Sequence, residues 1–289
     1  MDREKLHERI YSKIDELPTL PAVVPKILGL IGDEKSSAAD FTDTISKDLA
    51  LTSKILKVAN SAYYGFPQQI SRLEHAVALL GSNMVKSLAL SIGIIRTFSS
   101  HKRSPYFSVK GLWLHSLSVA MLMEELGRRL GKRKDNESLF IVGLLHDIGK
   151  VVLDQFFNDL FQQVLEEVNT QKGIKLHIAE QKVIGIDHCE LAGILLTRWK
   201  FPNNIIHSIT FHHHIHESEV ANPDNVVILR ISNIVAQQLG LGEEGNPTAN
   251  EVHESDLERL NMSDKDFDDL KAYSQDIKHE VEALFSAIV

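Results

Sequence analysis

Apolar residues recur along the chain at intervals of three and four positions, the spacing of one face of an α-helix. Ile55, Ala59 and Ala62 form one such series. Convincing alternation of apolar and polar residues between turn residues, which would indicate strands, is not found. The pattern predicts an all-α protein. We expect five or six short helices before residue 100, longer helices over 108–240, a loop over 240–255 and further helices to residue 287.

Helix start and stop signals mark several of these segments. Ser71–Glu74 and Ser255–Glu258 match a capping box, in which a serine and a glutamate three residues later bond to each other's backbone N–H groups. Asp187–Glu190 has the same form with aspartate as the cap. Gly81 is a typical helix stop, and Pro202 lies where a first-turn proline belongs. These signals support the helical prediction.

One short segment predicts an internal boundary. Residues 101–105 (HKRSP) are polar and include a proline, which disfavours a continuous helix. We expect an N-terminal helical subdomain over residues 1–105 and a second one over 106–289 that includes the C-terminal helices. A chain of 289 residues has the length of two ordinary domains.

The composition indicates which partners the protein can bind and in which compartment it is found. The net charge is −8, which argues against a general nucleic-acid binder, because such affinity rests on clustered Lys and Arg. Cys189 is the only cysteine, so no intrachain disulfide can form. Residues 1–16 lack the apolar core of a signal peptide, and no apolar run approaches the ~20 residues of a membrane helix. We expect a cytoplasmic protein that binds neither nucleic acid nor membrane.

Histidine is the residue type that suggests chemistry. Ten of the 14 histidines lie between His101 and His216, and histidine is the commonest metal ligand. His146 and Asp147 end an apolar segment that we expect to be a helix, with Gly149 as its stop. Imidazole nitrogen and carboxylate oxygen together suit Zn, Fe or Mn. The pair is therefore a candidate metal site.

Other candidate ligands belong to other predicted helices. His115 interrupts a strongly apolar segment, His188 opens another, and His212 and His213 end a third. Each has an ordinary explanation when taken alone: His115 as a hydrogen-bonded core residue, His188 as a helix-start residue. Ligands that each come from one helix and point inward are how helical bundles build metal sites. Their order along the chain favours the metal interpretation.

Three motifs in the first half occur together in one family. They are the paired Leu-Pro steps Leu17-Pro18 and Leu20-Pro21, the turn Asn60–Gly65 and the box Ala78–Gly81. Because these motifs follow one another in this order, the chain resembles the HDOD domain over about residues 17–239. Asp48 is followed by leucine where the family has proline. The resemblance implies a multi-helix fold, with an N-terminal helical subdomain packed on an HD-like bundle. It also implies a bacterial signalling or regulatory role, generally without the full catalytic set of related hydrolases.

The second half resembles the HD superfamily, and the HD-GYP phosphodiesterases most closely. That resemblance implies one or two ions of Fe, Mn, Ni or Zn, with Asp147 as the bridging carboxylate and Lys150 near a substrate phosphate. The implied ligands are His115, His146, Asp147, His188, His212 and His213.

The second half also departs from the HD-GYP pattern. Asn233 occupies the position of the final aspartate ligand, and the Gly-Tyr-Pro turn after the paired histidines is missing. His214 and Gly111 stand where those enzymes have glutamate. An asparagine is a neutral, weaker ligand, so a second ion would be held less well. From the residues alone we interpret Asn233 as a buried polar group that is hydrogen-bonded across the bundle.

Two functional hypotheses follow. The first is a regulatory protein that acts by binding a signalling protein or a nucleotide ligand, with a degenerate metal site and no hydrolase turnover. The alternative is a metal-dependent phosphohydrolase of a nucleotide or cyclic dinucleotide, in which Asp147 and Lys150 serve catalysis. An exposed apolar helix face would support a homodimer.

Overall fold

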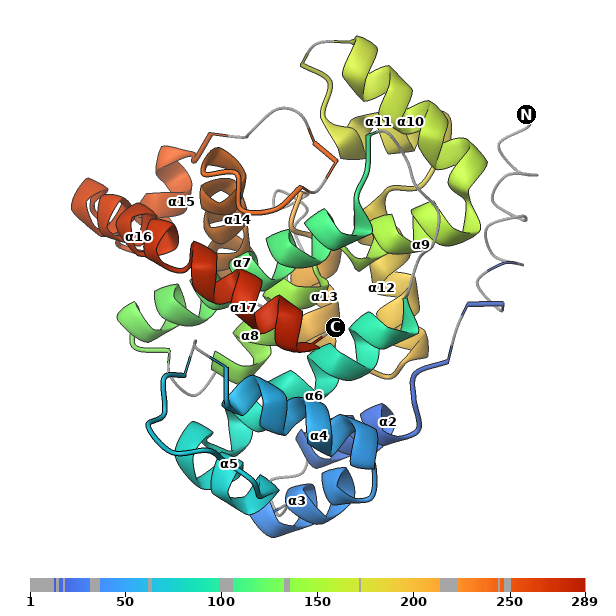
Figure 1. Ribbon diagram of the computed structural model, residues 1–289. Coiled ribbons are helices and arrows are strands. Elements are labelled where there is room, and N and C mark those ends of the chain that lie inside the picture. Colours follow the sequence, from blue (N-terminus) through green and yellow to red (C-terminus); the bar gives the residue numbers. More distant parts are fainter. Residues whose placement is uncertain are drawn as a thin grey trace. The chain divides into compact units, whose positions relative to one another are not determined.

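The computed structural model describes residues 13, 16–17, 19–31, 37–61, 64–98, 106–132, 136–171, 173–213, 223–243, 245–246 and 251–288 (Figure 1). Every regular element in these ranges is an α-helix, which confirms the predicted fold class. The chain divides into two compact units. The small unit comprises Thr19–Ser99 and Asp276–Val289, and the large unit Met1–Pro18 and Ser100–Gln275. A single cut near residue 105 does not describe this division, because the last helix belongs with the small unit.

The small unit is arranged around one buried helix. Helix α6 packs against all four helices that precede it in the unit, and its middle is buried on nearly every side. Gly93 lets α2 approach α6 closely, since a Cβ there would lie 2.4 Å from a methyl group of Val24. The helices are α2 (Val23–Ile31), α3 (Ala38–Ser46), α4 (Leu49–Ala59), α5 (Leu73–Leu80), α6 (Ser82–Thr97) and α17 (Lys278–Ile288).

The motifs of the first half have local structural roles. Asp48 caps α4 by accepting the N–H of Leu51 at 2.9 Å. Leu49 therefore occupies the first helical position, where proline is also well tolerated, and it is 82% exposed. At the other end of α4, the Asn60 side chain bonds both to the N–H and to the carbonyl of Ile70, each at 2.7 Å. Asn60 thus fixes the turn that leads to α5.

The other helices with described bounds belong to the large unit. The two in closest contact are α7 and α8, where a Cβ on Gly143 would lie 2.6 Å from Ala120 Cα. Helix α14 also packs on α7, and α12 packs on both α9 and α13. The helices are α7 (Val109–Arg129), α8 (Asn136–Leu145), α9 (Ile148–Phe156), α10 (Asn158–Thr170), α11 (Leu176–Val183), α12 (His188–Arg198), α13 (Asn203–Thr210), α14 (Pro223–Gln238), α15 (Glu254–Arg259) and α16 (Asp264–Asp276).

Of the three predicted capping boxes, one was right. Asp187 caps α12 in a complete capping box with Glu190. The box at Ser71 was wrong, because the backbone stays extended to Arg72 and α5 begins only at Leu73. The box at Ser255 was also wrong, because His253 is the N-cap and Ser255 already lies inside α15. Gly81 ends α5 with a positive φ of 85°, as predicted.

Some predictions concern residues outside the described ranges. They include the boundary at residues 101–105, parts of the first Leu-Pro step and of the Asn60–Gly65 turn, and the segment after His213 that contains His214. Within the described residues, no single helix is long and apolar enough to cross a membrane; α5 and α6, bent by 117°, reach the required length and composition only as a pair.

Candidate metal centre

The His146-Asp147 pair forms the junction between two helices. Helix α8 ends at Leu145, and Asp147 is the N-cap of α9. Gly149 was predicted to stop a helix, but it lies in the first turn of α9, so that prediction was wrong. Its lack of a side chain serves packing, because a Cβ there would lie 2.0 Å from the carbonyl oxygen of His188. This close approach brings the start of α12 against the His146-Asp147 turn.

The predicted ligands converge in the interior of the large unit. The rings of His115 and His146 have centroids 5.5 Å apart, and those of His146 and His212 are 5.4 Å apart. The ring centroids of His188 and His213 are 5.2 Å apart. All six predicted ligands gather in one region, and apart from the half-buried His213 all are buried. Two groups have potential ligand atoms within 4.8 Å of one another: His115, His146 and Asp147, and His188, Cys189, His212 and His213.

Asp147 lies between histidines of both groups. Its Oδ2 is 3.2 Å from His146 Nε2, and its Oδ1 is 3.3 Å from His188 Nε2. Both of these nitrogens, and Asp147 Oδ1, are buried without a hydrogen-bond partner among the described residues. Buried polar atoms normally have a hydrogen-bond or metal partner. Three neighbouring buried atoms without one indicate that a shared partner binds between them. A divalent cation satisfies nitrogen lone pairs and a carboxylate together, and these residues fit such an ion.

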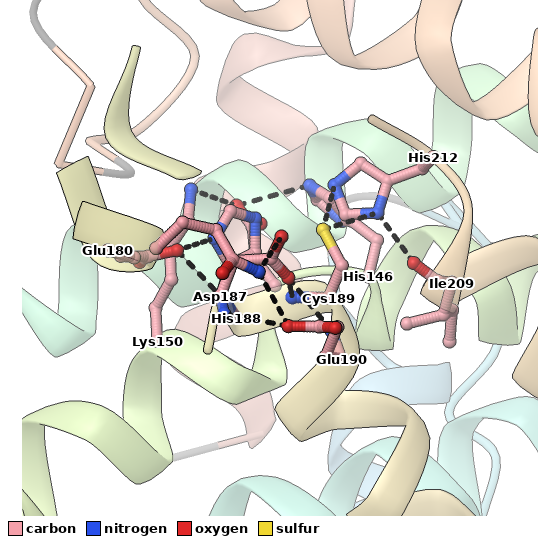
Figure 2. Close-up of polar contacts among 11 residues, drawn as sticks. His146, Lys150, Glu180, Asp187, His188, Cys189, Glu190, Ile209 and His212 are labelled. Atoms are coloured by element: carbon pink, nitrogen blue, oxygen red, sulfur yellow. Dashed lines mark hydrogen bonds and ion pairs between the residues drawn. The ribbon is translucent and has the colours of Figure 1, made fainter. Parts of the chain in front are cut away.

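Hydrogen bonds from the opposite ring nitrogens point lone pairs into the centre. His146 Nδ1 is 2.8 Å from the carbonyl of Gly143. His212 Nδ1 is 2.7 Å from that of Ile209 (Figure 2). A carbonyl oxygen only accepts, so both Nδ1 atoms carry the hydrogen and both Nε2 atoms carry the lone pair. His188 has the same arrangement through Glu180. This fixing of the tautomer is typical of metal-bound histidines.

His115 is oriented differently. Its Nε2 lies 2.9 Å from Asn233 Oδ1, which accepts a hydrogen from the ring. The lone pair of His115 is therefore on Nδ1, and Nε2 offers none. The structure confirms that Asn233 is a buried polar residue bonded across the bundle, because it is 4% exposed and joins α14 to α7. His115, a predicted ligand, and Asn233, the predicted degenerate position, are thus hydrogen-bonded to each other.

Lys150 provides a fixed positive charge at the centre. Its Nζ lies 2.8 Å from Asp147 Oδ2, and both side chains are almost fully buried. Burial by itself would raise the pKa of Asp147, but the interactions with His146 and with the Lys150 ammonium outweigh it and hold that pKa well below its ordinary value. The carboxylate is therefore ionised at neutral pH, and Lys150 holds one of its oxygens.

Four imidazoles of the centre, those of His115, His188, His212 and His213, are neutral at physiological pH. Burial lowers the pKa of His115 and of His212 to about 3, and the neighbouring His146 adds to the effect in both. Burial also lowers the pKa of His188 and of His213 well below the usual value; Lys150 adds most to the effect at His188, and His212 adds most at His213. Neutral imidazole is the form that binds metals. Burial raises the pKa of the Cys189 thiol well above its ordinary value, so in the absence of a cation it stays protonated.

Glu180, on α11, is a site residue that the sequence interpretation missed. Its Oε2 lies 2.6 Å from His188 Nδ1 and accepts the backbone N–H of His188 at 2.9 Å (Figure 2). Burial raises the pKa of Glu180 well above its usual range. Protonation at the unbonded Oε1 would leave Oε2 free for both bonds. The available signal was a glutamate beside Leu176 and Ala179, on the buried face of its helix.

We predict that replacing Glu180 weakens metal binding through His188. Glu180→Ala removes the acceptor that orients the ring, and we expect about a 10–100-fold loss of metal affinity. Glu180→Gln keeps a carbonyl oxygen for the same bonds and should lose much less. Competition with a chelating dye would measure both. Glu166→Gln, at an exposed position on α10, is the control and should leave the affinity unchanged. Equal losses for the alanine and glutamine variants would refute the positioning role.

Known proteins share the sequence pattern and the fold of this chain. The HDOD domain family model matches residues 17–215. An uncharacterized protein of Treponema pallidum (strain Nichols) is 28% identical over 220 residues, which are 76% of this chain and 42% of that protein. The chain spans less than half the length of the curated relatives it matches.

Solved structures agree over nearly the full chain. An HDOD domain protein of unknown function from Geobacter sulfurreducens is 27% identical with a TM-score of 0.82, covering 99% of this chain and 98% of that one. A Shewanella amazonensis protein whose proposed class is phosphohydrolase is 20% identical with a TM-score of 0.75, covering 97% and 98%. At that identity the second likeness is one of fold. The family match covers more than half of the residues, and the chain therefore belongs to the HDOD domain family.

Proposed function

We propose that this protein is a signalling or regulatory module that binds one divalent metal ion and does not turn over a phosphoester. The partner class is a signalling protein, with a nucleotide as the alternative ligand. The proposal rests on the chemistry of the centre in the large unit. Histidine ligands gather on the side of His188, His212 and His213, whereas on the other side the ring hydrogen of His115 is engaged by Asn233.

The contact between His115 and Asn233 carries the proposal. Hydrolysis by a pair of ions needs both to be held, so that one activates water and both stabilise the phosphoryl oxygens. In this chain the ring hydrogen of His115 points at Asn233 Oδ1 at 2.9 Å, and the amide brings no negative charge. Lys150 also occupies one oxygen of Asp147 at 2.8 Å. Both features favour a single ion on the His188 side.

The residues that would hold this ion are His188, His212 and His213, with Asp147 Oδ1 next to them. A bound ion would supply a fixed double positive charge and a Lewis acid. Glu180 orients His188, while the Ile209 carbonyl orients His212. These contacts make the ring positions rigid, which suits a structural or sensory site.

The metal content of Asn233→Asp is the direct test. We expect about one ion per chain in the wild type by elemental analysis, and a rise towards two in the variant, because a carboxylate restores the missing charge. Asn225→Asp is the matched control, since Asn225 is also buried on α14 but lies two turns away. It should not change the metal content. Wild-type protein without Fe, Mn, Ni or Zn would overturn the proposal.

Hydrolase activity is the second candidate function, favoured by one cavity. This cavity of about 380 Å³ reaches His212, His213 and Asn233, and Lys175 and Arg230 lie on its wall. Cationic side chains beside a metal centre suit a phosphorylated ligand. The measurement is turnover of a panel of nucleotides and cyclic dinucleotides by metal-loaded protein. Turnover that is lost in Asp147→Ala would replace the regulatory proposal with this one.

A further inference from the structure

Cys189 lies inside the candidate metal centre. It directly follows His188 on the first turn of α12, and its side chain is fully buried. Its Sγ lies 3.5 Å from His212 Nδ1 and 3.8 Å from His212 Nε2 (Figure 2). Within the described residues, Cys189 joins His188, His212 and His213 in a group whose potential ligand atoms all lie within 4.8 Å of one another. No part of the proposed function uses this sulfur.

We propose that Cys189 is a ligand of the metal ion, which makes the centre a mixed nitrogen and sulfur site with His188, His212 and His213. The inference rests on the proposed metal binding and adds the donor type. A zinc ion about 2.3 Å from sulfur and about 2.0 Å from nitrogen, in tetrahedral geometry, places the two atoms about 3.5 Å apart. The Sγ and Nε2 atoms of Cys189 and His212 are 3.8 Å apart, close to that value.

A second observation, separate from the cysteine, indicates an ion at the same place. His188 Nε2 is fully buried and has no hydrogen-bond partner among the described residues. Its ring is fixed, because Glu180 Oε2 lies 2.6 Å from Nδ1. The lone pair on Nε2 is therefore free to bind an electron acceptor, and Cys189 belongs with His188 to the group whose potential ligand atoms lie within 4.8 Å of one another.

The start of α12 holds the sulfur in position. The Asp187 side chain accepts the backbone N–H of Cys189 at 2.9 Å and that of Glu190 at 3.0 Å. Neighbouring residues at a helix end can both reach one ion, since the chain is not surrounded there by a further turn. On binding, the thiol releases its proton to solvent and the sulfur binds as thiolate.

Sulfur in the donor set determines which metals the centre prefers. Thiolate and imidazole together favour Zn²⁺ and Co²⁺, whereas oxygen-rich sites suit Mn²⁺ and Mg²⁺. Cys189→Ser should therefore lower the Zn²⁺ affinity by about tenfold or more, with the Mn²⁺ affinity changed by less than about threefold. A change of equal size for both metals would argue against a sulfur ligand.

Cobalt spectroscopy of the full chain is the decisive test. Metal-free protein is titrated with Co²⁺, and absorption is followed in the near ultraviolet and the visible. We expect a thiolate-to-cobalt charge-transfer band that grows with the visible d–d bands. Because the chain has one cysteine, such a band identifies Cys189 without any variant. Cys189→Ser should lose the charge-transfer band and keep d–d bands from the histidines.

The outcomes separate this inference from the proposed function. Cobalt binding with d–d bands but no charge-transfer band would overturn the sulfur ligand and leave the metal site standing. An absence of cobalt binding would overturn both. A charge-transfer band at one cobalt per chain would support both.

Discussion

Asp147→Asn is expected to lower the free energy of unfolding of the metal-free protein by about 3–5 kcal/mol, the usual result of removing one partner of a buried ion pair. The Lys150 ammonium stays buried but loses the carboxylate 2.8 Å away. The penalty for burying its charge then exceeds what the remaining contacts offset. Urea unfolding at neutral pH, in the presence of a chelator, measures the difference.

Two further variants test this explanation. Adding Lys150→Met to Asp147→Asn removes the unbalanced charge, and most of the lost stability should return. Asp43→Asn is the matched control, because Asp43 and Lys47 form an exposed ion pair on one helix face. Its cost should not exceed about 0.5 kcal/mol. If the double variant is less stable than Asp147→Asn, the charge explanation is incorrect.

Gly149→Ala is expected to damage both stability and metal binding. The added Cβ would lie 2.0 Å from the carbonyl oxygen of His188, and neither backbone segment can turn aside as a flexible side chain would. We expect a loss of about 3 kcal/mol in the free energy of unfolding. Displacement of His188 should also reduce metal affinity about 10–100-fold, as losses of ligand positioning do. Thermal unfolding and chelator competition measure the two effects.

Gly29→Ala is the matched control for this prediction. Gly29 is also a helical glycine, but a Cβ there would have nothing within 4 Å. Alanine should raise the stability by about 0.5–1 kcal/mol, through its higher helix propensity. Equal stability of the two alanine variants would show that the close approach of α9 and α12 is unimportant.

The sequence was informative where the determining pattern is local. Helical periodicity gave the fold class, and the motifs gave the family. The Asp187 box succeeded because its hydrogen bonds lie within four residues. The boxes at Ser71 and Ser255 failed because residue types alone do not specify where an extended backbone becomes helical. Before α5, the extended chain is held at Ile70 by the side chain of Asn60, a contact that the residues of the box do not reveal.

Much of the site could be predicted, but its internal arrangement could not. The six candidate ligands gather as their order along separate helices indicated. The bond between His115 and Asn233 joins residues 118 positions apart, and no local pattern reveals which ring nitrogen it occupies. Glu180 and Cys189 were missed because neither belongs to the recognised ligand pattern. Gly149 was misinterpreted because a glycine that ends a helix and one that admits a neighbouring backbone look alike in sequence.

The pairing of α17 with α4 affects how the chain folds during synthesis. In the small unit, Lys54 of α4 donates to the Ile288 carbonyl at 2.5 Å, and the buried Val281, Leu284 and Phe285 lie on α17 (Figure 1). Roughly 180 residues separate the two segments of this unit. At ribosomal rates of about 5–20 residues per second, α4 waits roughly 10–40 s for its partner. The small unit is therefore completed only after the segment of the large unit between its two parts has been made, and the apolar face of α4 is meanwhile available to chaperones.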